Sequence, residues 1–292
     1  MSLSEEKTGV ITLQEEAYVL ERAYVPEHIV NLMGPISKGE PFLKEDHLGF
    51  VKDNWLILVG YPLDGNFSQD RTERVVKQAV ETFRPEYLWF IGPEVLPSLL
   101  NSCTERETDR YYTLDIEQTK LKPSLQRIAD KASEELTVER SYAFSKDHET
   151  LVAELLKREK LPPRIRELYR AMPDYVARSS SACVINARDK NGKLCAFFIV
   201  ELGAKNFSAY VLGSHSKKHY VPHASDLLFL EMIKLTREHG KRTINLGLGV
   251  NEGIRRFKEK WGGVPYLDYQ FYERIYETTR TVSLIKSLEG KL

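Results

Sequence analysis

The spacing of apolar and polar residues predicts a regular order of elements in the second half of the chain. The predicted elements are a strand over 137–144, helices over 146–159 and 162–172, strands over 181–189, 193–203 and 207–214, a helix over 224–240, a strand over 242–249, a short helix over 251–262 and a strand over 264–276. The helix over 224–240 is apolar around much of its circumference, which is typical of a helix buried within a domain. Asn191-Gly192 marks the turn of a hairpin between two of the strands.

The first half repeats the end of this order. It predicts a strand over 54–62, a helix over 68–83, a strand over 86–93, a short helix over 94–103 and a strand over 109–116. Gly60 and Gly92 lie 32 residues apart, and Gly213 and Gly247 lie 34 apart. We therefore predict two copies of one α/β (α+β) domain, over 1–135 and 136–292, joined by a helix over 121–135. Each copy is expected to be a mixed, mostly antiparallel twisted sheet flanked by helices.

Charge is balanced over the whole chain and unbalanced within it. Lys plus Arg equals Asp plus Glu at 42 each, which argues against general nucleic-acid binding through a strongly basic surface. Between Lys205 and Gly262, however, eleven basic residues face five acidic ones. We expect any anionic partner to bind in this C-terminal third.

Targeting and redox signals point to the cytoplasm. The three cysteines favour a reducing compartment over a disulfide framework. No apolar run reaches the length of a membrane span, and the first residues lack the features of a signal peptide. We expect a soluble, cytoplasmic protein with no membrane span; the oligomeric state stays open.

One short stretch carries a family resemblance. In GIRRFKEKWGG, a strand ending in glycine leads into a helix with Phe257-Lys258, two further residues and Trp261-Gly262. This motif and the order of elements resemble the GNAT superfamily of N-acyltransferases, and the doubled arrangement resembles its Fem branch of aminoacyl and peptidyl transferases. The resemblance implies two tandem GNAT-like domains, an acyl-CoA (acetyl-CoA) or aminoacyl-tRNA donor, and an amine acceptor that attacks directly.

The loop before the buried helix departs from the acetyl-CoA pattern. It reads GSHSKKHYVPHAS and lacks the glycines whose N–H groups hold a pyrophosphate in such members. Asp226, near the start of the helix, would repel an anion there. Ordinary acetyl-CoA binding is therefore disfavoured, while an aminoacyl-tRNA, another acyl carrier or a modified CoA site stays open.

Lys258 is the leading catalytic candidate. On a helix, Ile254, Phe257 and Trp261 share one face and Lys258 lies beside it, whereas Lys260 is expected to point more toward solvent. An ammonium at this position can stabilise the negative charge that acyl transfer develops, and the resemblance implies a functional role for this lysine. The alternative is that Phe257 and Trp261 are core and Lys258 only extends along them.

The remaining candidates surround the same region. In the resembling fold, N–H groups near Leu212, Gly213 and Ser214 bind the carbonyl oxygen, and Tyr220 donates a proton to the leaving group, with Tyr210 and Tyr269 as alternatives. Candidates for donor binding are Lys217, Lys218, His219, Gly247, Gly249, Asn251, Arg255 and Arg256. A solvated loop and a tight glycine turn are the structural alternatives for these residues. His215, His219 and His223 recur at a spacing that suits a metal only on a helix, and Pro222 indicates a loop, so no metal is predicted.

Two functions follow, with a lipid-linked acyl or aminoacyl transferase as a third reading that would need an apolar surface groove. The first is an N-acyltransferase that moves an acyl or aminoacyl group from an activated carrier to an amine. The second is a non-catalytic GNAT-like module that binds RNA or an acylated ligand. No Ser-His-Asp or Cys-His arrangement suggests a covalent intermediate.

Overall fold

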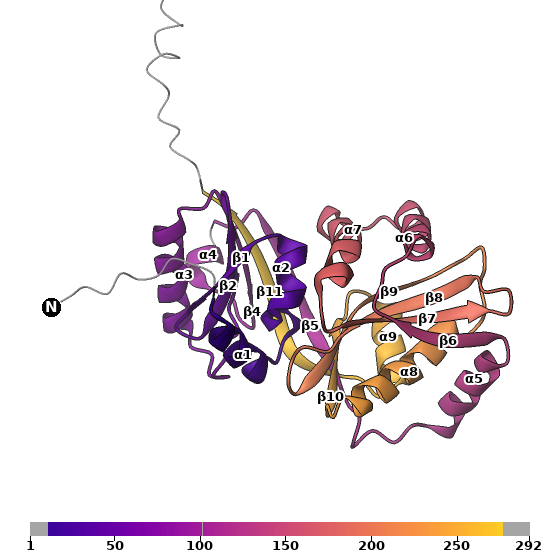
Figure 1. The fold of residues 1–292 in the computed structure, drawn as a ribbon. Helices are drawn as coiled ribbons and strands as arrows, with labels where there is room; N and C mark the ends of the chain where they lie inside the picture. Colours follow the sequence, from indigo (N-terminus) through magenta and orange to yellow (C-terminus); the bar gives the residue numbers. More distant parts are fainter. Residues whose placement is uncertain (1–10, 101, 277–292) are drawn as a thin grey trace, which may run out of the picture.

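A single mixed sheet runs through both halves of the protein (Figure 1). The computed structural model describes residues 11–100 and 102–276, and within them eleven strands form one sheet in the order β1-β2-β3-β4-β11-β5-β10-β9-β8-β7-β6. The neighbours β3–β4 and β9–β10 are parallel, and the other neighbouring pairs are antiparallel. This confirms the predicted class of a mixed, mostly antiparallel sheet flanked by helices.

The first half contains the predicted elements and several that the sequence pattern did not indicate. Its elements are α1 (Leu13–Arg22), the 3₁₀ helix η1 (Pro26–His28), α2 (Val30–Ser37), β1 (Glu40–Lys44), β2 (His47–Lys52), β3 (Trp55–Val59), α3 (Gln69–Phe83), β4 (Tyr87–Gly92), α4 (Pro97–Leu100) and β5 (Glu105–Asp115). The turn between β1 and β2 places Glu45 and Asp46 at positive φ. Because neither is glycine or asparagine, this hairpin lacks the usual sequence signal of its turn.

The second half follows the predicted order. Its elements are α5 (Pro123–Ser133), β6 (Leu136–Ser141), α6 (Lys146–Arg158), α7 (Pro163–Arg178), β7 (Ala182–Asp189), β8 (Leu194–Glu201), β9 (Phe207–His215), α8 (Ala224–Glu238), β10 (Thr243–Leu248), α9 (Glu252–Lys260) and β11 (Val264–Ile275). None of the helices in the described part of the chain is long and apolar enough to cross a membrane.

The last strand leaves its own half of the chain. Strand β11 pairs with β4 on one side and with β5 on the other, while the other edge of β5 pairs with β10. In Figure 1, β11 (yellow) accordingly runs within the indigo half. Strands from both sides of the predicted boundary at 135/136 therefore share one hydrogen-bonded surface, and the boundary itself stays a prediction.

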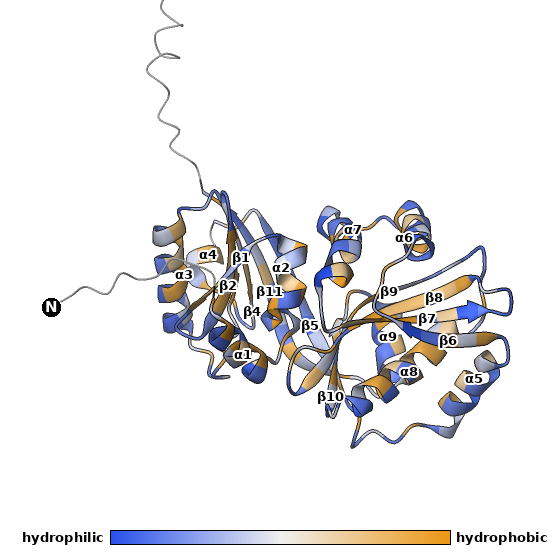
Figure 2. Ribbon diagram, in the orientation of Figure 1, coloured by the Kyte–Doolittle hydropathy of each residue, from blue (hydrophilic) through white to orange (hydrophobic). Residues whose placement is uncertain are grey.

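Helix α8 is buried in the second half, as predicted. Ten of its residues are buried, among them Leu228, Phe229 and Met232, and they pack against β7, β8 and the aromatic side chain of Trp261. Figure 2 shows the apolar strands and this helix in orange, with hydrophilic positions on the outer faces. The buried free thiols of Cys183 and Cys195 belong to the same core.

Candidate functional site

Strands β9 and β10 pair over a short length and then part. Their register covers only Phe207–Ala209 against Thr243–Asn245. Beyond this point each strand carries one extra residue against its other neighbour: Val211 in β9 and Leu246 in β10. An extra residue bends a strand and increases its twist, so the bulges open a fork between β9 and β10.

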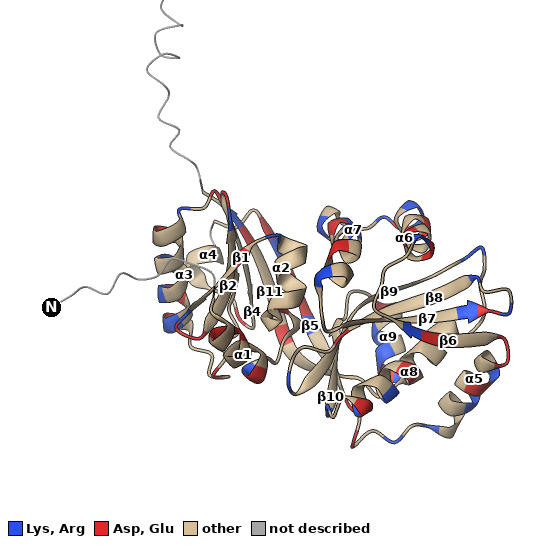
Figure 3. Ribbon diagram, in the orientation of Figure 1, with Lys and Arg blue, Asp and Glu red and all other residues tan. Residues whose placement is uncertain are grey.

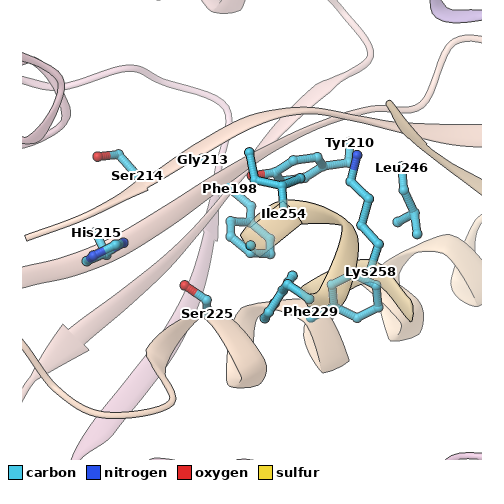
Figure 4. A pocket seen from close by; sticks show the side chains of 12 residues that line it. Phe198, Tyr210, Gly213, Ser214, His215, Ser225, Phe229, Leu246, Ile254 and Lys258 are labelled. Atoms are coloured by element: carbon cyan, nitrogen blue, oxygen red, sulfur yellow. The ribbon is translucent and has the colours of Figure 1, made fainter. Parts of the chain in front are cut away.

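A cavity of about 280 Å³ occupies the fork (Figure 4). Its walls come from β8, β9, α8, β10 and α9, and its lining residues are Phe198, Tyr210, Gly213, Ser214, His215, Ser225, Phe229, Leu246, Gly253, Ile254, Phe257 and Lys258. Aromatic and aliphatic side chains therefore form most of the wall, with a few polar groups among them.

Local hydrogen bonds fix helix α9 at the edge of the cavity. The side chain of Asn251 caps the helix by accepting from the Ile254 N–H at 3.0 Å. One residue before this cap, the Val250 N–H donates to the Asp109 carboxylate on β5 at 2.7 Å. At the other end, Trp261 is buried and stacks on Phe229 with ring centroids 4.8 Å apart. These contacts set the direction in which the α9 side chains point.

Lys258 projects from α9 to the open end of the fork. Its side chain is 4% exposed, and its Nζ donates to the carbonyl oxygen of Leu248 on β10 at 2.5 Å. The ring centroid of Tyr112 lies 5.6 Å from the same nitrogen. Burial lowers the pKa of the Lys258 amine to about 7, and the negative charge of Asp109 opposes this shift. The amine can therefore be charged or neutral close to neutral pH.

Gly247 lies where the fork opens. Its φ of +72° is in the left-handed region, and its N–H donates to the Asn245 side-chain oxygen at 2.8 Å. A Cβ placed at Gly247 would lie 3.7 Å from the Tyr210 carbonyl oxygen and 4.0 Å from Lys258 Nζ. Both strands of the fork and the buried amine therefore meet at this glycine.

Of the predicted site residues, Gly213, Ser214 and Lys258 line the cavity. The side chain of Leu212 packs on the other face of the sheet, with the core under α6 and α7. The register partners of 212–214 in β8 are Ile199, Phe198 and Phe197. Because N–H groups alternate between the two edges of a strand, this segment directs at least one of its N–H groups toward β10.

The other predicted residues lie around the cavity without lining it. Gly247 lies near the end of β10, and Gly249 and Asn251 lie in the turn between β10 and α9. Lys217, Lys218, Arg255 and Arg256 are exposed, and His219 is half-buried. Figure 3 shows Lys and Arg along α9. Tyr220 is 61% exposed and does not line the cavity, and its catalytic role stays a prediction.

Lys260 differs from its expected orientation toward solvent. Its amine donates to the Asp226 carboxylate at 2.5 Å, and the indole N–H of Trp261 donates to the same oxygen at 3.0 Å. The second oxygen of Asp226 lies 3.1 Å from His223 Nδ1. Asp226 is thus buried in the first turn of α8 with three partners, at the helix end where an acetyl-CoA site would place a pyrophosphate.

Several cavity residues were not predicted as site residues. The sequence pattern offers Tyr210 only as an alternative to Tyr220, and His215 only as a possible metal ligand. Phe198 and Phe229 looked like ordinary core positions, and nothing in the local pattern distinguishes a core ring from a ring on a cavity wall. Within the residues that the structure describes, no group of three or more His, Cys, Asp or Glu side chains could hold a metal ion.

Solved structures share this architecture. FemX superimposes with a TM-score of 0.60 at 12% identity, covering 94% of this chain and 98% of its own. L-PGS from Bacillus licheniformis superimposes with a TM-score of 0.56 at 15% identity, covering 97% of this chain and 98% of its own. A tandem GNAT protein from the clavulanic acid biosynthesis pathway gives 0.52 at 14% identity, covering 78% of each chain.

Sequence comparison adds no assignment, since no protein-family model and no curated protein matches the chain. The structural matches show that the chain has the tandem GNAT-like fold, and the expected resemblance to GNAT-fold proteins and the Fem type is confirmed at the level of fold.

Proposed function

We propose that this protein is an N-acyltransferase that moves an acyl or aminoacyl group from an activated carrier to an amine, with the chemistry at the β9–β10 fork. The observation that carries the proposal is the buried amine of Lys258 beside the cavity of the fork. Burial of a cation without a carboxylate in direct contact lowers the stability of the folded state. The loss is several kcal/mol, because each unit by which the pKa falls corresponds to about 1.4 kcal/mol. A catalytic role for the amine would explain why the protein keeps a destabilising group at this position.

The proposed reaction is direct attack. The acceptor nitrogen bonds to the carbonyl carbon of the donor, the carbonyl oxygen becomes negative, and the carbon–oxygen or carbon–sulfur bond to the carrier then breaks. The Lys258 ammonium stabilises the negative oxygen together with a backbone N–H of 212–214. Because its pKa is about 7, this ammonium can also pass a proton to the leaving oxygen or sulfur and regain one from the acceptor nitrogen.

The region around α8 favours an aminoacyl-tRNA donor over acetyl-CoA. Asp226 occupies the first turn of α8 with its own ion pair, so a pyrophosphate there would lie against a buried carboxylate. The exposed cations Lys217 and Lys218 of the loop after β9 and Arg255 of α9 are available for carrier phosphates, and Arg256 would exchange its ion pair with Glu252 for such a contact.

The test is a transfer assay over a panel of charged tRNAs and CoA thioesters with primary amines as acceptors. Lys258→Ala should reduce transfer by about a hundredfold or more, as loss of one charge-stabilising donor does elsewhere. Lys241→Ala is the matched control, because Lys241 is also buried and donates to a carbonyl, that of Ala204, on another part of the fold. Full activity in a folded Lys258→Ala protein removes Lys258 from the mechanism.

A panel with no turnover would contradict the proposal. Tight binding of tRNA or of an acylated ligand, measured by calorimetry without turnover on any amine, would instead support the non-catalytic binding module.

A further inference from the structure

The fork cavity combines one titratable amine with an apolar interior. Phe198, Phe229 and Ile254 enclose its middle, and the Phe198 and Tyr210 rings meet edge to face with centroids 4.9 Å apart. In Figure 4, Lys258 approaches Tyr210 at one end, while Ser214, His215 and Ser225 lie on the other side of these rings. A group that enters from the reacting end therefore meets mostly carbon atoms, and the first further polar group is the Tyr210 hydroxyl beside Gly213.

The charges at the cavity are all of one kind. Of the residues that the structure describes, those that line it include no Asp and no Glu. The neighbouring carboxylates are already engaged. Asp226 binds Lys260, and Asp109 accepts from the Val250 and Arg110 N–H groups. Glu159, whose charge opposes the pKa shift of His215, binds Arg158, and Glu259 accepts from the Tyr112 hydroxyl. Burial and the nearby cations Arg158 and Lys217 lower the pKa of His215, so this ring does not supply a fixed charge at neutral pH.

We infer that the cavity binds the side chain of the transferred acyl group, and that this side chain is uncharged and apolar. The inference rests on the proposed function and names the substrate class of the same site. A cationic side chain would be buried beside Lys258 with no counter-ion, and burial of an unpaired charge is strongly unfavourable. An anionic side chain would lose its hydration among aromatic rings, and it would occupy the Lys258 ammonium that the proposed reaction needs for the carbonyl oxygen.

Ile254 is a suitable position for a substitution that changes the volume of the cavity. It is 37% exposed and lines the wall, so a larger side chain at this position reaches the cavity without disturbing a packed core. Ile254→Trp should fill part of the space. Ile275→Trp is the matched control, because Ile275 is similarly exposed at 46% and lies at the end of β11, outside the lining.

The experiment is a titration of the isotope-labelled full chain with three six-carbon amides, followed by NMR at neutral pH. Hexanamide carries an apolar tail, ε-aminocaproamide a cationic tail and adipamic acid an anionic tail on the same amide. We expect hexanamide to bind at least about tenfold more tightly than either charged amide. A tenfold ratio of affinities corresponds to about 1.4 kcal/mol, and burial of an unpaired charge costs more free energy than this. The shifts should involve residues of the cavity wall, and Ile254→Trp should weaken hexanamide while Ile275→Trp leaves it unchanged.

Other outcomes overturn the inference. These are equal or tighter binding of a charged amide, binding of hexanamide that Ile254→Trp does not alter, and absence of shifts at the cavity with all three amides. Because the titration needs no turnover, its failure is distinct from failure of the transfer assay, which contradicts the proposed function.

Discussion

The amine of Lys258 on α9 lies 2.5 Å from the carbonyl oxygen of Leu248 on β10. This bond crosses the turn at 249–251 and holds a 4% exposed cation at the open end of the strand fork. The same contact links the stability of the turn to the charge of the proposed catalytic group.

The rate of transfer should depend on the charge of Lys258. If its ammonium stabilises the developing oxyanion, kcat/KM should fall as pH rises through about 7, the pKa of the buried amine. Rate profiles from pH 5.5 to 9 on the wild-type and Lys258→Ala proteins check this. The descending limb should be absent from the residual activity of the variant, and its persistence there would assign the titration to another group.

Lys258→Met should stabilise the protein at neutral pH. The pKa of the amine falls from 10.5 to about 7 on folding, so the unfolded chain binds the extra proton between these values and wild-type stability rises with pH across that range. The variant also loses the hydrogen bond to Leu248. Allowing for that loss, we expect its free energy of unfolding to exceed that of the wild type by about 2–3 kcal/mol at pH 6, and the difference to shrink toward pH 10. Urea unfolding at several pH values measures it, with exposed Lys217→Met as the control that should show no such trend. A gain that grows with pH would show the opposite sign of linkage.

Gly247→Ala should destabilise the fold through its backbone. A non-glycine residue at φ +72° costs about 1–2 kcal/mol, although the added methyl group itself has ordinary space. Gly253→Ala is the contrasting control, because Gly253 lies within α9 at ordinary φ and alanine there favours the helix by up to about 1 kcal/mol. Thermal unfolding of the two variants should shift the Tm in opposite directions; equal shifts would argue against backbone strain at Gly247.

Asp226→Ala should be strongly destabilising. The change removes the acceptor of both the Lys260 amine and the Trp261 indole N–H, which lie 2.5 and 3.0 Å from it. We expect a loss of about 2–4 kcal/mol in urea unfolding, with a smaller loss for Asp226→Asn, whose side-chain oxygen still accepts from Trp261. A near-neutral Asp226→Ala would mean that the carboxylate is not part of the structural support of α9.

Glu27→Gln should stabilise the protein at neutral pH and have little effect in acid. Among the described residues, Glu27 Oε2 is buried without a hydrogen-bond partner, and burial raises the pKa of this carboxyl. The free energy of unfolding is therefore highest below the pKa of Glu27 in the unfolded chain, and it falls as pH rises through the higher pKa in the folded protein. The glutamine variant does not lose this stability. Unfolding at pH 4 and pH 7.5 tests this against Glu21→Gln, where the Lys205 amine lowers the pKa and the trend should reverse. The prediction fails if Glu27→Gln is more stabilising at pH 4 than at pH 7.5.

Some features were encoded locally and could be predicted. The second half shows its helices and strands directly, because burial of one face repeats with the period of the element. Lys258 could be placed beside the Phe257 and Trp261 face for the same reason, and both aromatic side chains do pack on the core. The paired carboxylate of Asp226 lies 35 residues before Trp261, so no local pattern could show that Lys260 turns inward to reach it.

The sequence by itself determined the kind and order of most elements, the buried position of α8 and the basic character of the C-terminal third, since each depends on neighbouring residues. Only the tertiary structure decided that β11 lies between β4 and β5, that bulges at Val211 and Leu246 open the fork, and that Phe198, Tyr210 and Phe229 line a cavity. The physical reason is that strand pairing and cavity shape depend on contacts between distant segments. Hydrophobic periodicity records that a side chain is buried, and packing determines which side chain it is buried against.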